Sequence, residues 1–260
     1  MTMAQAPTLH RVMHPIKRRR LDVLRVTQLT PRMRRITLGG PELEGFISLG
    51  ADDHIKVFFA QTPEQEAVLA SWMPGGDPSG PQPAMRDYTP RRIDLERGEL
   101  DIDFVIHGDG PASTWAEQAK PGDHLHIGGP RGSLIVPDIF DSYLLIGDET
   151  ALPAIARRLE ELPANREALV VVQIEDAAER QPLHSAASLQ VVWVERHKAD
   201  LLEVVRGLRL PAGNLWAWVA TEKGLSRQLR AALVEHHQLE DGLIKAAGYW
   251  RAEATPDDEA

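Results

Sequence analysis

The run Arg86-Asp87-Tyr88-Thr89 combines a cation, an aromatic ring and a hydroxyl at spacings that suit a flavin nucleotide. On a strand, alternation directs Arg86 and Tyr88 to one face and Asp87 and Thr89 to the other. A guanidinium suits a pyrophosphate, an aromatic ring can lie against an isoalloxazine, and a threonine hydroxyl can reach flavin N5. By itself the run is better explained as a barrel strand with a surface arginine, so the flavin interpretation needs a second segment.

That second segment is His107 to Ser113, which predicts a seat for a phosphate group. An apolar strand runs into a glycine-rich turn at Gly110, Pro111 suits a first helical position, and a short helix then starts around Ala112. Amides exposed at a helix start, together with the Ser113 hydroxyl, bind phosphate well. A simple capped turn is the alternative for this segment alone, but its place after the arginine-tyrosine-threonine run favours a flavin.

A candidate nicotinamide site follows an apolar strand, Tyr143–Gly147, which ends in glycine. The residues after this strand are Asp148, Glu149, Thr150 and Ala151. A strand that turns into a helix in this way places amides at the carboxyl edge of a parallel sheet, where nucleotides bind. The Gly-x-Gly-x-x-Gly fingerprint is missing at this turn, so an ordinary crossover remains the alternative.

Residues at the ends of two later strands bear on the choice of nicotinamide cofactor. They are Glu195 and Arg196 after one strand, and Thr221, Glu222 and Lys223 after the next. A cation there can hold the 2′-phosphate of NADPH, whereas an acid favours the free ribose hydroxyl of NADH. Both signs of charge are present, so these residues leave the donor open.

Composition limits the chemistry available to the chain. Its 260 residues, of which 43% are apolar, suffice for two modest domains. Cysteine is absent, which excludes disulfides and cysteine-ligated iron–sulfur clusters, so redox chemistry requires an organic cofactor. The net charge of -9 argues against nucleic acid binding. No apolar run approaches about 20 residues and Met1–Pro15 lacks a secretory signal, so we expect a cytoplasmic protein without membrane contact.

Two halves of the chain show different patterns. Before about Pro137, short strands alternate with turn signals such as Gly39-Gly40-Pro41, as in a small antiparallel barrel. After it, continuous apolar strands alternate with helical segments, which indicates a parallel sheet covered on both faces. The expected organisation is a barrel domain over residues 18–137, an α/β domain over residues 138–252 and an acidic tail over residues 253–260.

The same patterns predict individual elements. The strands of the first half are Leu21–Leu29, Met33–Leu38, His54–Phe59, Met85–Ile93, Glu99–Val105 and His124–Gly128. Those of the second half are Tyr143–Gly147, Leu169–Ile174, Leu189–Val194, Leu215–Ala220 and Leu243–Tyr249, with helices over Leu152–Leu162, Ala199–Arg206 and Gly224–His236. The insert Gln61–Pro83, rich in proline and glycine, is expected to be a mobile loop.

Two histidine pairs, His124/His126 and His236/His237, raise the question of a metal site. Neither pair has, in the sequence, the carboxylate or the further histidine that a strong metal site needs. We therefore expect both pairs to be structural.

Several motifs in one order make the sequence resemble the siderophore-interacting protein family, the ferric-siderophore reductases related to ferredoxin-NADP reductases. The resemblance runs from about Arg18 to Arg251. Its motifs are Leu29-Thr30-Pro31-Arg32-Met33-Arg34-Arg35, Asp52-Asp53-His54-Ile55-Lys56, Arg86-Asp87-Tyr88-Thr89, His107-Gly108 through Trp115-Ala116, Gly128-Gly129-Pro130-Arg131-Gly132-Ser133, Gly147-Asp148-Glu149-Thr150-Ala151-Leu152-Pro153-Ala154-Ile155 and Gly248-Tyr249-Trp250-Arg251.

The resemblance implies a fold and a set of cofactor contacts. The first half is expected to be a Greek-key flavin-binding barrel, and the second a parallel-sheet, nicotinamide-binding α/β domain. FAD contacts are expected at Arg86, Tyr88 and Thr89 and along the turn from His107 to Ser113. Trp250 either lies over a cofactor ring or closes the core.

Cations are expected to attract the substrate. Ferric siderophores, above all tris-catecholates, are anionic, so their reductase needs positive charge near the flavin edge. The resemblance places Lys56 and Arg131 near the open face of the flavin, and Arg251 at the end of the last strand is a third candidate. Each alone is better explained by a surface salt bridge, whereas the three together favour an anion site.

The expected activity is that of an FAD-dependent ferric-siderophore reductase. NAD(P)H, with NADPH the expected donor because the family often uses it, delivers a hydride to flavin N5, and the reduced flavin passes single electrons to ferric iron. The cofactor performs this chemistry, so no catalytic acid or base is expected. Ferredoxin stays open as another donor. The alternatives are a flavin oxidoreductase with a different acceptor and a siderophore-binding carrier that moves no electrons.

Overall fold

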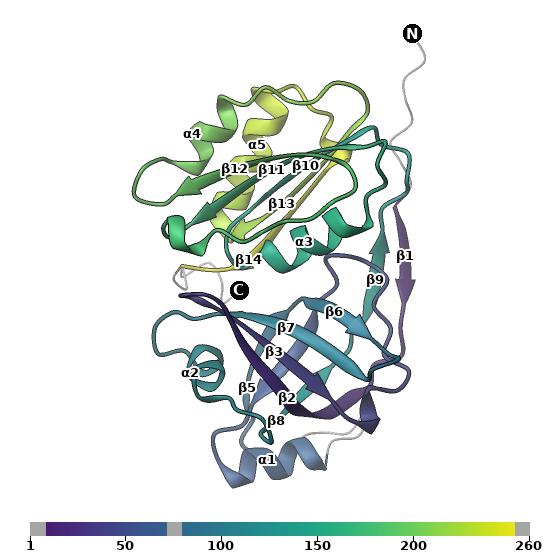
Figure 1. The fold of residues 1–260 in the computed structure, drawn as a ribbon, viewed down its shortest axis with the longest axis vertical. Helices are drawn as coiled ribbons and strands as arrows, with labels where there is room; N and C mark the ends of the chain where they lie inside the picture. Colours follow the sequence, from purple (N-terminus) through teal and green to yellow (C-terminus); the bar gives the residue numbers. More distant parts are fainter. Residues whose placement is uncertain (1–8, 72–79, 253–260) are drawn as a thin grey trace. The chain divides into compact units, whose positions relative to one another are not determined.

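The computed structural model describes residues 9–71 and 80–252, and the chain divides into two compact units. One unit comprises His10–Val136, and the other begins at Pro137. Figure 1 shows an antiparallel sheet in the first unit and a parallel sheet with helices in the second. Within the described ranges, no helix combines the length and the apolar character that a membrane span requires.

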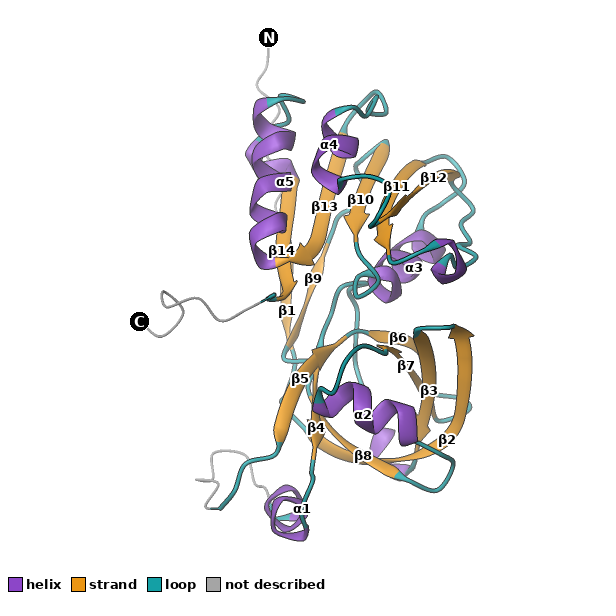
Figure 2. Cartoon of the chain, turned by 90° about the vertical axis from the view of Figure 1, so that its left-hand side faces the viewer, coloured by secondary structure: helices purple, strands orange, loops and turns teal. Residues whose placement is uncertain are grey.

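A seven-stranded antiparallel sheet forms most of the first unit. Its order is β5-β4-β8-β2-β3-β7-β6, so β5 and β6, which are consecutive in the chain, are the two edge strands. The sheet curls into an open barrel, and α2 packs at one open end (Figure 2). The strands are β2 (Arg18–Thr30), β3 (Met33–Gly39), β4 (Ile55–Phe59), β5 (Ala84–Tyr88), β6 (Pro90–Asp94), β7 (Glu99–Val105) and β8 (His124–Gly128). A separate ribbon pairs β1 (His10–Met13) with β9 (Gly132–Ile135), and the helices are η1 (Pro41–Leu43), α1 (Pro63–Ala70) and α2 (Pro111–Gln118).

Alternation along the strands builds the barrel core. On β7, Leu100, Ile102 and Phe104 belong to the apolar cluster inside the barrel. The intervening Asp101 and Asp103 are buried too, because Arg92 and Thr37 bind the first and Arg35 binds the second. The period-two pattern of the sequence therefore predicted the strand correctly, while the burial of its polar side depends on partners from β3 and β6.

Two expectations for the first unit need correction. The predicted strand Met85–Ile93 is interrupted at Thr89, which separates β5 from β6. The predicted loop Gln61–Pro83 contains α1, because Pro63 occupies the first turn and the Thr62 side chain accepts a hydrogen bond from the Gln65 amide. Residues 72–79 of this insert, like the acidic tail at 253–260, lie outside the described residues.

Glu99 on β7 couples the stability of the first unit to pH. Hydrogen bonds from Arg25 and Arg92 lower its pKa from 4.5 to about 2. A carboxyl whose pKa is depressed by folding stabilises the folded state above its unfolded-state pKa, and the stabilisation is lost as pH falls through the folded-state pKa. We expect Glu99→Gln to have a lower urea midpoint than wild type at pH 7, with the difference shrinking between pH 4.5 and about 2. Identical midpoints at pH 7 would contradict this expectation.

Five parallel strands form the second unit, in the order β12-β11-β10-β13-β14. Helix α3 covers one face of the sheet, and α4 and α5 cover the other (Figures 1 and 2). The strands are β10 (Ser142–Gly147), β11 (Glu167–Ile174), β12 (Ser188–Glu195), β13 (Leu215–Glu222) and β14 (Ile244–Trp250). The helices are α3 (Leu152–Glu161), η2 (Ala177–Glu179), α4 (Leu201–Arg206), α5 (Lys223–Glu235) and η3 (Asp241–Leu243). Every residue of β10 is buried, and the predicted parallel α/β architecture is confirmed.

Candidate functional site

The arginine-tyrosine-threonine run ends the edge strand β5. Arg86 is exposed, and its Nη1 donates a hydrogen bond to the Met85 carbonyl at 2.8 Å. Tyr88 is partly buried, and desolvation raises the pKa of its phenol, so the hydroxyl stays neutral. Thr89, only 6% exposed, is the residue at which the chain passes from β5 to β6.

A cluster of aromatic rings connects β5 with α2. The ring centroids of Tyr88 and Phe104 are 4.4 Å apart, and Phe104 lies 5.7 Å from Trp115 on α2. Phe59 on β4 completes the cluster, at 6.5 Å from Tyr88 and 6.0 Å from Trp115. These contacts bring the two segments with predicted flavin chemistry, which are distant in sequence, into one region of the barrel.

The start of α2 has the features expected of a phosphate seat. Gly110 is the N-cap residue, no side chain caps the helix, and Pro111 stands in the first turn. A Cβ placed on Gly110 would meet no atom within 4 Å, so open space adjoins the backbone here. Ser113 is 2% exposed, and its Oγ accepts a hydrogen bond from the His107 amide at 2.9 Å. The serine hydroxyl thus fixes the turn, while the uncapped amides remain for a ligand.

These residues fit a flavin dinucleotide by the chemistry of their donors. The exposed guanidinium of Arg86 and the uncapped amides of α2 both suit a pyrophosphate. Tyr88 and Trp115, the partly buried members of the aromatic cluster, offer apolar surface to a ring system. The open space beside Gly110 allows a phosphate to approach the backbone closely.

Two of the predicted substrate cations lie at one end of the barrel sheet. Lys56 on β4 pairs in register with Gly128 on β8, and Arg131 follows in the loop after that strand. The Nζ of Lys56 contacts both carboxylate oxygens of Asp87, at 2.7 and 2.8 Å. Arg131 is exposed. Lys56 is therefore positioned by an ion pair with the run that is predicted to bind the flavin.

The structure adds a cation that the site prediction missed. Arg18 on β2 pairs with Gly128 from the opposite side to Lys56, and its guanidinium lies 4.2 Å from the centroid of the Phe58 ring. Arg18 lies in the basic run Lys17–Arg20, which is the signal in the sequence that could have pointed to it. Arg251, the third predicted cation, is exposed directly after β14 in the second unit.

In the second unit, Gly147 is required by packing. A Cβ on it would lie 2.5 Å from the Cβ of Ala151, 3.0 Å from Cδ1 of Ile155 and 3.3 Å from the carbonyl oxygen of Ala220. The glycine therefore lets the start of α3 pack directly on β10. Ala151, which is fully buried, is the N-cap of α3, and no side chain caps this helix either.

Asp148 connects this turn to the last strand. It is 2% exposed and accepts hydrogen bonds from the amide and hydroxyl of Thr150, at 2.9 and 2.5 Å. Its other oxygen accepts a hydrogen bond from Trp250 Nε1 at 2.8 Å. Burial raises the pKa of this carboxyl despite these bonds. Trp250 is 39% exposed, so its indole is held by one edge while part of its surface faces solvent.

Glu149 and Arg196 form an ion pair of 2.7 Å at the carboxyl edge of the parallel sheet. Arg196 also donates to Gln173 at 2.8 Å and lies 3.5 Å from Glu175. Burial raises the pKa of Glu149, which is 9% exposed. Two carboxylates thus already compensate the Arg196 charge, which makes this guanidinium a poor candidate for a 2′-phosphate.

The other strand-end candidates have structural partners. Glu195 forms ion pairs with Arg180 and Lys198. Glu222 is the N-cap of α5, where its carboxylate accepts from the Leu225 amide at 2.9 Å. Thr221 is fully buried. Glu195, Arg196 and Glu222 therefore hold the sheet edge and the start of α5.

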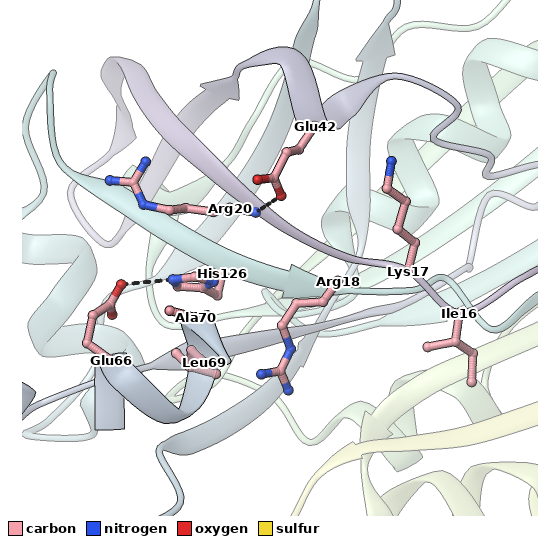
Figure 3. A pocket seen from close by; sticks show the side chains of 9 residues that line it. All are labelled: Ile16, Lys17, Arg18, Arg20, Glu42, Glu66, Leu69, Ala70 and His126. Carbon is pink, nitrogen blue, oxygen red and sulfur yellow. Dashed lines mark hydrogen bonds and ion pairs between the residues drawn. The ribbon is translucent and has the colours of Figure 1, made fainter. Parts of the chain in front are cut away.

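One histidine pair outside these sites has a partner that the sequence did not reveal. His124 and His126 do have a carboxylate partner, because Glu66 Oε1 lies 2.8 and 2.9 Å from their Nε2 atoms (Figure 3 draws the bond to His126). Glu66 lies on α1, inside the insert that was interpreted as a loop, so nothing in the sequence connected it to β8. In the second pair, His237 Nε2 contacts the Val205 carbonyl at 2.7 Å, as a structural residue would.

Comparison with known proteins agrees with this geometry. The family model of the siderophore-interacting FAD-binding domain matches residues 22–134, and that of the siderophore-interacting protein matches residues 140–253. The chain is 38% identical to the NADPH-dependent ferric-chelate reductase of Escherichia coli, over 93% of this chain and 96% of that protein. It is 30% identical to the ferric vibriobactin reductase of Vibrio cholerae, covering 90% and 89%. The crystal structure of a siderophore utilization protein from T. fusca superposes with a TM-score of 0.84 at 35% identity, covering 95% and 98%.

Proposed function

The chain belongs to the siderophore-interacting protein family, and we propose that it is an FAD-dependent reductase of siderophore-bound ferric iron with NADPH as donor. Relatives that match nearly the whole chain are ferric reductases by name. The observation that carries the proposal is the uncapped, open start of α2. Aromatic contacts connect this helix to β5, the strand that carries the exposed Arg86.

When bound, FAD supplies the redox chemistry, by accepting a hydride from NADPH and giving electrons singly to ferric iron. Arg86 and the turn with His107, Gly110, Pro111, Ala112 and Ser113 are proposed to hold its pyrophosphate. Tyr88 and Thr89 are proposed to orient the ring system. None of these side chains has to exchange a proton, so the reaction requires no catalytic acid or base from the chain.

We assign the two cofactors to separate domains. Residues 18–137 are proposed to bind FAD and residues 138–252 to bind NADPH. In the latter, the turn Gly147–Ala151 would contact the nicotinamide cofactor, and the Asp148 bond keeps the Trp250 indole beside that turn. The cytoplasm is the proposed location, because it holds the NADPH pool.

An anionic ferric chelate of the catecholate type is the proposed substrate. Lys56, Arg131 and Arg251 would attract it, since cations beside an open site raise the local concentration of anions. Ferredoxin is a second donor that the same assay can test.

Anaerobic stopped-flow absorbance tests the function directly. FAD-loaded protein is mixed with NADPH, NADH or reduced ferredoxin in turn, and then with a ferric catecholate siderophore. We expect the flavin absorbance to bleach with NADPH and to return when the chelate is added, with ferrous iron formed. Siderophore binding without any NADPH oxidation would instead identify a carrier, and faster transfer to a quinone than to any ferric chelate would identify a different oxidoreductase.

Removing two cations should weaken the apparent affinity for an anionic chelate. We expect Lys56→Ala with Arg131→Ala to raise KM for a ferric tris-catecholate about tenfold, because two partly exposed charges each contribute up to about 1 kcal/mol. FAD content should be unchanged, and KM should depend less on salt than in wild type.

A neutral ferric chelate and the variant Arg97→Ala are the controls. Arg97 is an exposed cation of the same unit that pairs with Asp94, and its loss should leave KM unaltered. An equal rise in KM for the neutral and the anionic chelate would rule out an electrostatic role for Lys56 and Arg131.

A further inference from the structure

Three potential metal ligands converge where α1 lies on the outside of the barrel. His124 and His126 alternate along β8, so both imidazoles project from the same face of the sheet. Glu66 comes from α1, and its Oε1 lies 2.8 Å from Nε2 of His124 and 2.9 Å from Nε2 of His126. One ligand atom from each residue lies within 4.8 Å of those of the other two. Figure 3 shows Glu66 and His126 facing each other.

The cluster is buried on one side and open on another. His126 is 5% exposed, whereas the side chains of His124 and Glu66 are 33% and 37% exposed. Glu66 and His126 line a cavity of 540 Å³, and all three residues line a second cavity of 240 Å³. The histidine ligands are thus held by the barrel, while space for water or a further ligand adjoins them.

The three ligands favour particular metal ions. Two imidazoles and one carboxylate, with positions left open, suit divalent ions such as Zn²⁺ and Fe²⁺. Metal bonds of about 2.0–2.1 Å at tetrahedral angles separate ligand atoms by about 3.3 Å, so an outward shift of a few tenths of an ångström by Glu66 would admit an ion.

We propose that Glu66, His124 and His126 form a binding site for a divalent first-row transition-metal ion, which joins α1 to β8. The alternative is a hydrogen-bonded triad without metal, in which one carboxylate oxygen serves two imidazoles. Fe²⁺ is also the ion that the reductase reaction would release, and a role in receiving that product rests on the proposed function. Metal binding itself does not rest on it.

Titration of the untagged, FAD-loaded protein with metal ions distinguishes the metal site from the metal-free triad. Metal is first removed from the protein with a chelator. Zn²⁺ is then added in air, or Fe²⁺ anaerobically, and binding is followed by calorimetry. We expect one equivalent to bind, and Glu66→Gln to weaken binding at least about 100-fold, since even the loss of a residue that only orients a metal ligand costs up to about that factor. A triad that holds no metal predicts instead that neither ion binds to wild type. His124→Gln is a second variant with the same expectation.

Thermal unfolding supplies an independent readout. Zn²⁺ at about 100 times its Kd should raise the Tm of wild type by about 5 °C and leave that of Glu66→Gln unchanged. The matched controls are Glu42→Gln, a carboxylate on the wall of the larger cavity, and His236→Gln, from the other histidine pair. Both should bind metal as wild type does.

The outcomes of these experiments test the metal site separately from the reductase activity. Absence of binding for both ions in wild type, or equal binding by wild type, Glu66→Gln and His124→Gln, would overturn the metal site. Fe²⁺ binding with the same dependence on Glu66 and His124 would support capture of the product ion, and Zn²⁺ binding alone would make the site one for zinc. Failure of the stopped-flow experiment would contradict the proposed function and leave these titrations valid.

Discussion

Replacing Arg86 with alanine is expected to weaken FAD binding about 100-fold, equivalent to about 3 kcal/mol, because charge-assisted hydrogen bonds to a phosphate are lost. The side chain is exposed on β5, and its Nη1 donates a hydrogen bond to the carbonyl of the preceding residue, Met85. The stability of the barrel should therefore change little. Fluorescence titration of the flavin-free protein with FAD measures the affinity, and urea unfolding measures the stability.

Two further variants make this result specific. Arg86→Lys keeps the charge but not the planar fork of donors, so its affinity should lie between those of wild type and Arg86→Ala. Arg11→Ala removes an exposed arginine on β1, in the same unit, and should bind FAD as wild type does. Unchanged FAD affinity in Arg86→Ala would remove the arginine from the flavin site and weaken the assignment of the whole β5 segment.

Replacing Gly147 with alanine is expected to destabilise the second unit by about 2 kcal/mol. The added Cβ would meet the Ala151 methyl group at 2.5 Å and Ile155 Cδ1 at 3.0 Å, so α3 must shift away from β10. Such a shift moves the turn from Asp148 to Ala151 as well. The urea midpoint of the second unit and the KM for NADPH should therefore change together.

Gly207→Ala is the matched control in the same unit. A Cβ at Gly207 meets only ordinary contacts, at 3.6 Å from the carbonyl oxygens of Glu203 and Val204. This variant should unfold at nearly the wild-type urea concentration. A Gly147→Ala protein as stable as Gly207→Ala would show that α3 can be displaced without cost, and would contradict the packing role of the glycine.

Trp250 was expected either to lie over a cofactor ring or to close the core. Its exposure disagrees with the second expectation, and the first stays a prediction. Its indole N–H is bound by a buried carboxylate, while 39% of the residue is exposed. The tryptophan is therefore positioned by the same turn that is proposed to contact NADPH.

Local patterns were sufficient for most strands and helices. The apolar run Tyr143–Gly147 corresponds to β10 within one residue, and the predicted helix Gly224–His236 corresponds to α5 within one residue at each end. Such segments have a period that neighbours in the chain already specify. The fold class and the order of the two architectures followed from these periods. The break of the predicted strand Met85–Ile93 at Thr89 did not, because it depends on β5 and β6 lying at opposite edges of the sheet.

The sequence by itself determined the residue types available for chemistry. These are a run that suits a flavin, a glycine-rich helix start and basic residues, while cysteine is absent. Only the tertiary structure decided which of them meet. Glu66 is 58 and 60 residues from its histidine partners, and Asp148 is 102 residues from Trp250. Contacts across such separations depend on how helices dock on sheets and on the register of strands, and no local period of the chain encodes them.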